Sequence, residues 1–243
     1  MRLGARHRPG RAVCGPRPAP GGHHGGVTDV DTPAGTAQVV LDRPDGPVLA
    51  LLMLGHGAGG GIDAPDLVAV RDAVLPAGVA VARVTQPYRV AGRRAPGPAP
   101  RLDAAWLAVA ATMPENWPTI FGGRSSGARV ACRTAAVAGA VGVVALAFPL
   151  HPPGRPERSR APELLATGVP TLVVNGDRDP FGIPEAVPAS RRRGAPSPGV
   201  EVLVRPGEDH SLRKDPAAVG QLVLRWLVRR GWGSQPVAAA SRL

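Results

Sequence analysis

The chain has 243 residues, 44% of them hydrophobic, so it can bury one sizeable core and leaves little for a second domain. Its formal net charge is +11, but only 3% of the residues are aromatic and these do not alternate with the cations, which argues against a nucleic-acid surface built on base stacking. Two cysteines support neither a disulfide framework nor a cysteine metal site.

The N-terminal stretch differs in composition from the rest of the chain. Residues 1–26 contain seven Gly, four Pro and five Arg, no acidic residue and almost no large apolar side chain. Such a segment cannot nucleate a core, so we expect a disordered basic tail over 1–26, a folded domain over 27–232 and a flexible C-terminal tail over 233–243. The tail lacks the apolar middle of a secretory signal, and no later run is long enough to span a bilayer. We therefore expect a soluble cytoplasmic protein with no membrane or nucleic-acid partner.

Short apolar runs alternate with segments of helical period from Thr36 onward, which is typical of strands joined by helical crossovers. This predicts an α/β fold with a mostly parallel sheet. The expected strands are an edge strand Thr36–Leu41, then Val48–Leu54, Val79–Val84, Thr119–Phe121, Val141–Phe148, Thr171–Val174 and Val200–Val204. The expected helices are Asp66–Pro76, Arg101–Met113, Ser126–Ala138 and Pro216–Arg229.

Proline-rich loops follow several of these strands at their carboxyl ends, namely Gln86–Pro100, Pro149–Pro162 and Asp179–Pro188. In an open parallel sheet, ligands bind at that edge, so we expect the functional site there.

A candidate nucleophile lies in the stretch Gly123-Arg124-Ser125-Ser126-Gly127. Ser125 has glycines two residues away on both sides, whereas Ser126 is flanked at those positions by Arg124 and Ala128. The stretch follows a predicted strand and begins a predicted helix, as a nucleophile elbow does. We therefore predict that Ser125 is a nucleophile rather than a polar residue of a glycine-rich turn.

A serine hydroxyl needs a base and an acid that orients this base. His210 follows the last predicted strand, whereas His56 and His151 come earlier than the chain order Ser, Asp, His allows. We favour Asp179 as the acid because it lies far enough past a strand to turn inward, while Asp177 and Asp209 stay open as alternatives.

An anion formed at a substrate carbonyl also needs preorganised donors. The backbone N–H of Ser126 is one candidate. The run "HGAGGG" after the strand Val48–Leu54 offers the backbone N–H of Ala58 or Gly59 as the second. The same run is a poor phosphate loop because it lacks the Gly-Lys-Ser/Thr ending.

Five stretches in this order, "LGHGAGGG", "GGRSSGARVACR", "FPLHPPGRP", "GDRDPFG" and "EDHSL", resemble those of the α/β-hydrolase superfamily, close to the dienelactone-hydrolase-like enzymes. More narrowly, the chain resembles a small bacterial branch related to the testis-expressed and NSL-complex hydrolase-like proteins. The resemblance runs from about Val27 to Arg230. It implies the α/β-hydrolase fold, a mostly parallel sheet with helices on both faces, with Ser125 as nucleophile, Asp179 as acid and His210 as base.

Two features depart from a typical member of the superfamily. Arg124 is bulky for the position before the nucleophile, and no long insertion is left for a lid domain, so the proline-rich loops must shape the pocket. His151 and Arg155 are candidates to contact a substrate carboxylate or phosphate; alternatively, prolines merely stiffen this loop and its arginines are solvated.

The sequence thus predicts a serine hydrolase that cleaves an ester, thioester or small amide of a small-molecule acyl substrate through an acyl-enzyme. It implies no metal and no organic cofactor. The alternative is a binding or scaffold protein that has kept a hydrolase fold without its activity.

Overall fold

The computed structural model describes residues 25–189 and 198–236. Residues 1–24 of the predicted N-terminal tail and residues 237–243 of the predicted C-terminal tail lie outside these ranges. Ser234, within the second predicted tail, donates a backbone hydrogen bond of 2.8 Å to the carbonyl oxygen of Ala77.

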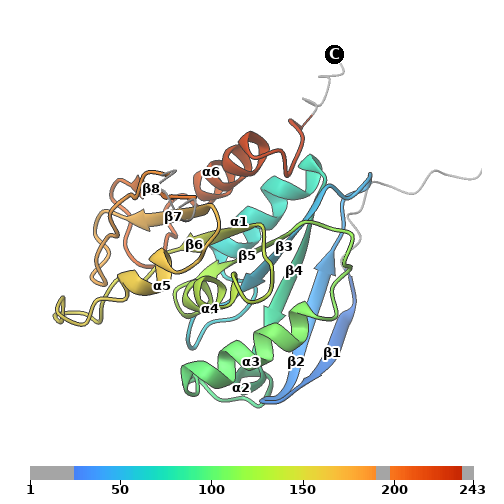
Figure 1. Cartoon of the computed structure of the whole chain (residues 1–243), viewed down its shortest axis with the longest axis horizontal. Helices are drawn as coiled ribbons and strands as arrows, with labels where there is room; N and C mark the ends of the chain where they lie inside the picture. The colour runs from blue at the N-terminus through green and yellow to red at the C-terminus, as the bar shows by residue number, and fades with distance from the viewer. Residues whose placement is uncertain (1–24, 190–197, 237–243) are drawn as a thin grey trace, which may run out of the picture.

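One eight-stranded sheet forms the centre of the molecule (Figure 1), with strand order β1-β2-β4-β3-β5-β6-β7-β8. The strands are β1 Val27–Thr32, β2 Gly35–Asp42, β3 Ala50–Gly55, β4 Val79–Thr85, β5 Thr119–Arg124, β6 Gly142–Leu146, β7 Thr171–Gly176 and β8 Val200–Arg205. Strands β3 to β8 are mutually parallel, whereas β2 is antiparallel to both β1 and β4. The predicted mostly parallel sheet is confirmed.

The central strands are buried along their whole length. Every residue of β3, β6 and β7 is buried, as is all of β4 except its last residue. This explains their nearly continuous apolar sequences, because a parallel strand covered by helices on both faces has no solvent side.

The expected edge strand Thr36–Leu41 is not at the edge. It belongs to β2, and β1 pairs with its outer side from Val27 opposite Val40 to Thr32 opposite Gly35. The sequence of β1, VTDVDT, carries too few apolar residues to stand out as a strand, because most of its side chains face solvent. Charged residues on an outermost strand also discourage pairing with another chain.

Helices cover both faces of the sheet. The segments are α1 Pro65–Val74, the 3₁₀ helix η1 Leu75–Ala77, α2 Pro87–Val90, α3 Ala99–Ala110, α4 Ser126–Thr134, α5 Ala161–Leu165 and α6 Pro216–Arg229. On one face, α1 and α6 pack together; α3 and α4 lie on the other (Figure 1). The predicted first helix becomes 3₁₀ after Val74, where Pro76 lacks the N–H that an α-helical turn would use. The short helix α2 lies inside the expected loop Gln86–Pro100, and α5 begins at the end of the expected loop Pro149–Pro162; each has proline in its first turn.

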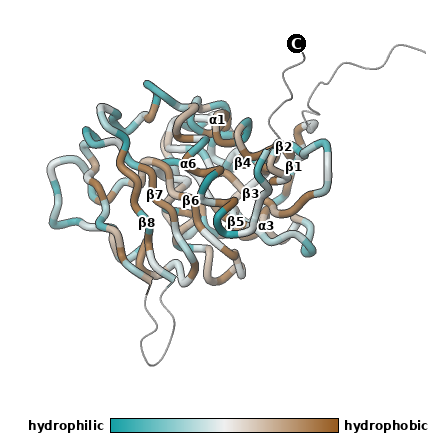
Figure 2. The backbone as a smooth tube through the Cα atoms, turned by 90° about the horizontal axis from the view of Figure 1, so that it is seen from above, coloured by the Kyte–Doolittle hydropathy of each residue, from teal (hydrophilic) through white to brown (hydrophobic). Residues whose placement is uncertain are grey.

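Two hydrophobic cores result, one on each face. Trp106 of α3 packs edge-on against Phe121 of β5 in the first, and Trp226 of α6 packs against Trp232 in the second. Figure 2 shows hydrophobic segments mainly along the central strands and hydrophilic ones mainly in peripheral loops. In the described part of the chain, no helix combines the length and apolarity that crossing a membrane requires.

Candidate active site

Ser125 lies at a sharp turn between β5 and α4. Its backbone has φ 51° and ψ −110°, a conformation that residues with a side chain rarely adopt. The turn is held by a hydrogen bond of 2.9 Å from the Ser125 N–H to the carbonyl oxygen of Leu146 on the neighbouring strand. Such local strain is typical of functional sites, and here it leaves the serine side chain partly exposed at the carboxyl edge of the sheet.

Gly123 and Gly127 are required because the backbone on either side of Ser125 passes very close to the end of β3. A Cβ atom on Gly123 or on Gly127 would clash with the carbonyl oxygen of Gly55. Gly123 also has φ 156°. The Gly-x-Ser-x-Gly spacing therefore lets the elbow fit against the end of the next strand.

The side chains of Ser125, His210 and Asp179 lie in one hydrogen-bonded row. The Nε2 atom of His210 is 2.9 Å from the Oγ of Ser125, and its Nδ1 is 2.8 Å from the Oδ2 of Asp179. The Asp179 side chain is fully buried, whereas 21% of the His210 side chain is exposed. The structure thus brings together the three residues that the sequence singled out from separate loops.

The Asp179 carboxylate is held by the loop after β7. Its Oδ1 accepts a 2.9 Å bond from the N–H of Phe181, and its Oδ2 accepts a longer one, 3.4 Å, from Nδ2 of Asn175. Asn175 is itself fully buried and also bonds the N–H and the carbonyl oxygen of Phe148. Sequence analysis missed Asn175, although one amide side chain in an otherwise apolar buried strand could have indicated its role.

His210 is positioned by the loop after β8. The ring of Phe181 stacks on the His210 imidazole with centroids 4.2 Å apart and planes tilted by 34°. Gly176 allows this loop to approach β7, because a Cβ atom there would clash with the carbonyl oxygen of Glu208. The contact of Phe181 with His210 had no signal in the sequence.

The other two candidate acids, Asp177 and Asp209, accept hydrogen bonds from loop residues, and no hydrogen bond joins either of them to the His210 ring. Asp177 accepts a 2.7 Å bond from the N–H of Gly207. Asp209 accepts bonds from the N–H and the hydroxyl of Ser211, and these lower the pKa of its exposed carboxyl.

The loop after β3 is organised by His56. Its Nε2 accepts a 3.1 Å bond from the N–H of Gln86, so the ring proton is on Nδ1, which lies 2.8 Å from the carbonyl oxygen of Gly57. Burial lowers the pKa of His56, although the bond to Gly57 opposes the shift. A neutral imidazole therefore ties this loop to the end of β4.

The two candidate donors in this loop, Ala58 and Gly59, lie in the same exposed turn. Residues 57–60 form a turn closed by a 3.1 Å bond from the N–H of Gly60 to the carbonyl oxygen of Gly57. Burial raises the pKa of Tyr88, although the charge of Arg89 and the backbone of Gly59 oppose the shift. Ala58 is exposed. On the other side, Ser126 begins α4, where the first N–H groups have no partner within the helix.

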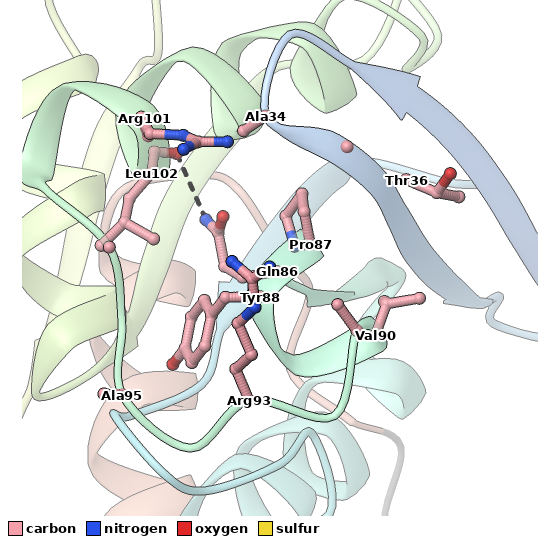
Figure 3. Close-up of a pocket in the computed structure, with 13 residues that line it drawn as sticks. Ala34, Thr36, Gln86, Pro87, Tyr88, Val90, Arg93, Ala95, Arg101 and Leu102 are labelled. Carbon is pink, nitrogen blue, oxygen red and sulfur yellow. Dashed lines mark hydrogen bonds between the residues drawn. The ribbon is translucent and has the colours of Figure 1, made fainter.

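Two cavities lie close to these loops. The first, of about 490 Å³, is lined by Arg124, Arg178, Pro180, Asp209, His210, Ser211 and Arg213. The second, of about 360 Å³, lies between the turn Ala34–Thr36 and the segment that follows β4, with Gln86, Tyr88, Arg93 and Arg101 in its wall (Figure 3). Gln86 and Tyr88 connect the second cavity to the loop after β3, because the N–H of Gln86 bonds the His56 ring and the Tyr88 ring lies 5.8 Å from it, centroid to centroid.

His151 and Arg155 line neither cavity. The N–H of His151 donates to the carbonyl oxygen of Phe181, and its ring lies against Gly182, so this residue packs on the loop that carries Asp179. Arg155 is exposed. Within residues 25–189 and 198–236, no group of three or more His, Cys, Asp and Glu side chains could hold a metal ion.

Solved structures of known hydrolases share this fold. A serine hydrolase homologue from Coxiella burnetii is 17% identical, with a TM-score of 0.64 over 83% of this chain and 97% of that one. A serine hydrolase without a lid from Xanthomonas campestris is 17% identical, with a TM-score of 0.63 over 86% and 95%. Dienelactone hydrolase from Anabaena variabilis is 18% identical, with a TM-score of 0.64 over 84% and 96%.

No curated protein matches the sequence. Residues 48–220, however, match the model of a family described as an alpha/beta hydrolase domain. That segment runs from the approach to β3 into α6 and contains Ser125, Asp179 and His210. The chain belongs to the α/β-hydrolase family.

Proposed function

We propose that this protein is a serine hydrolase that cleaves an ester, thioester or small amide through an acyl-enzyme formed on Ser125. The observation that supports this most strongly is the imidazole of His210, which contacts the Ser125 hydroxyl with one nitrogen and the buried Asp179 carboxylate with the other.

The bond to Asp179 determines which nitrogen acts as the base. A carboxylate only accepts hydrogen bonds, so the Nδ1 of His210 carries the proton and its Nε2 has a free lone pair. That lone pair faces the Ser125 hydroxyl and takes its proton as the oxygen attacks the substrate carbonyl. The imidazolium then gives the proton to the leaving group. In the second half of the reaction, the same Nε2 takes a proton from a water molecule that attacks the acyl carbon, and it returns this proton to the Ser125 oxygen as the acid leaves.

The carbonyl oxygen becomes negatively charged during the attack and needs two N–H donors. The Ser126 N–H at the start of α4 is the first. For the second donor we propose the N–H of Ala58, with the N–H of Gly59 in the same turn as the alternative. The helix dipole of α4 adds further stabilisation of the negative charge.

The substrate reaches Ser125 from the carboxyl edge of the sheet. In the described ranges, the loops leave both the serine and the histidine partly exposed, with no separate lid domain over them. The nearby cavities of about 490 and 360 Å³ are of the size that small-molecule sites have.

Substitution of the nucleophile tests the proposal. We expect Ser125→Ala to lower kcat for p-nitrophenyl acetate by at least about 10³-fold, because binding and the oxyanion donors remain but the nucleophile is lost. Ser159→Ala is the matched control, since it removes an exposed hydroxyl from the loop before α5, and it should keep the wild-type rate.

Two results would contradict the proposal. Wild-type activity in Ser125→Ala would show that another residue performs the hydrolysis. Absence of activity in the wild type, across acyl chains of increasing length, would favour a hydrolase-fold scaffold protein.

A further inference from the structure

We propose that Arg124 is a positioning residue whose guanidinium group holds three segments in register. These are the turn at Ser125, the loop after β8 that carries His210, and the loop after β3 that carries Ala58, called the oxyanion loop below. The inference rests on the proposed function of Ser125. It concerns the residue that looked out of place in the sequence, a bulky cation directly before the nucleophile.

The guanidinium of Arg124 spans two distant segments. Its Nε donates a 2.8 Å bond to Oδ2 of Asp66, near the start of α1. Its Nη2 donates to the carbonyl oxygen of His210 at 2.9 Å and to that of Ser211 at 3.4 Å. The residue next to the nucleophile in the chain thereby holds the backbone of the base itself.

The same group also lies close to the start of the loop after β3 that carries Ala58. A Cβ atom on Gly57 would lie 3.1 Å from Nη1 of Arg124 and 3.5 Å from the Cβ of Ser125. The absence of a side chain at Gly57 therefore leaves room for both residues and places Arg124 beside the start of the loop carrying Ala58.

Burial makes this arrangement rigid. The Asp66 side chain is completely buried and that of Arg124 is 17% exposed, so neither charge is well solvated without the other. Asp66 is further fixed by a 3.0 Å bond from the N–H of Leu67 to its Oδ1. A planar guanidinium can serve a carboxylate and a carbonyl at once, whereas an ammonium group on a flexible stem cannot reproduce that geometry.

Loss of this arrangement should affect the reaction more than substrate binding. The distance from Nε2 of His210 to the Ser125 hydroxyl depends on where the histidine backbone lies, and a displacement of about 1 Å can cost about 100-fold in rate. The Nε and Nη2 donors of Arg124 bond protein groups, so we expect little change in KM.

The test compares Arg124→Lys with the wild type after titration of active sites with a fluorophosphonate probe. We expect kcat per titrated site on p-nitrophenyl acetate to fall about 10- to 100-fold, with KM unchanged within about twofold. Counting titrated sites separates this effect from misfolding, which removes sites without slowing those that remain.

Two further variants complete the design. Arg133→Lys is the matched control, because Arg133 is 18% exposed and bonds Asp103 through two nitrogens away from the site; its kcat per site should stay at the wild-type value. Asp66→Asn keeps an acceptor for Arg124 but removes the charge, and should lower kcat per site in the same direction as Arg124→Lys.

Three results would overturn the inference. The first is a wild-type kcat per titrated site in Arg124→Lys, and the second is an equal loss in Arg133→Lys. The third is a rise in KM at constant kcat, which would make Arg124 a substrate contact. Failure of the proposed function is distinguishable from all of these, because the wild type itself would then not react with the probe.

Discussion

Asp179 acts in the proposed reaction only through His210. Its carboxylate accepts hydrogen bonds from the Phe181 N–H, from Asn175 and from the imidazole, so it fixes both the orientation and the tautomer of the ring. An amide in its place could donate to Nδ1 and so favour the tautomer whose Nε2 carries a proton and cannot act as a base.

We therefore expect Asp179→Asn to lower kcat for ester hydrolysis by about 10³- to 10⁴-fold while the fold is kept. Stopped-flow or steady-state rates together with a thermal unfolding curve measure this. Asp177→Asn is the matched control, because that exposed carboxylate bonds the Gly207 N–H, lines neither cavity and should not alter the rate. A larger loss in Asp177→Asn than in Asp179→Asn would contradict the orientation that we propose.

The sequence identified some residues of the candidate site and missed others. Ser125 could be chosen over Ser126 by glycine spacing, and Asp179 and His210 by their chain order after predicted strands; the structure places the three in contact, and their catalytic roles remain predictions. Asn175 was missed although an amide in a buried strand was a signal, whereas Phe181 could not be identified, because its importance lies in a contact with a residue that is distant in sequence. The predicted substrate contacts of His151 and Arg155 also remain untested.

At the level of elements, the elbow depends on how closely β5 and α4 approach β3. Gly127 has an ordinary backbone conformation, so its requirement for glycine is purely steric. An added methyl group would press on the Gly55 carbonyl at the root of the oxyanion loop.

Gly127→Ala should therefore lower the free energy of unfolding by about 1 to 3 kcal/mol, because well-packed backbone must move apart. Chemical denaturation with urea measures the change. Gly46→Ala is the matched control, since a Cβ atom there meets nothing within 4 Å, and its stability should be close to that of the wild type. Equal stability of Gly127→Ala and the wild type would show that the contact relaxes freely.

The order of elements explains which of them the sequence could reveal. Fully buried strands such as β3 and β6 carry continuous apolar runs, and α6 has an apolar stripe and the side-chain cap Asp215, so these elements could be predicted to within a few residues. The missed elements, β1, α2 and α5, are short or largely exposed and bury too little surface to impose a pattern.

At the scale of the whole molecule, the parallel sheet brings distant loops to one edge. The strands β5, β6, β7 and β8 are adjacent and parallel, so the segments after β5, β7 and β8 meet there although Ser125 and His210 are far apart in the chain. This is why the fold class, and the edge at which the three candidate residues meet, could be predicted from alternating elements. Two features could not be predicted from the sequence. One is that β4 lies between β2 and β3 in the sheet, and the other is the existence of β1.

The most direct test of the account is to locate the covalent adduct of a fluorophosphonate probe. Trypsin cleaves after Arg124 and after Arg129, so Ser125 and Ser126 fall in one peptide whose fragment masses distinguish the two serines. We predict a single adduct on the oxygen of Ser125. An adduct on Ser126 or elsewhere, or no adduct in a folded protein, would contradict the claim that Ser125 is the nucleophile.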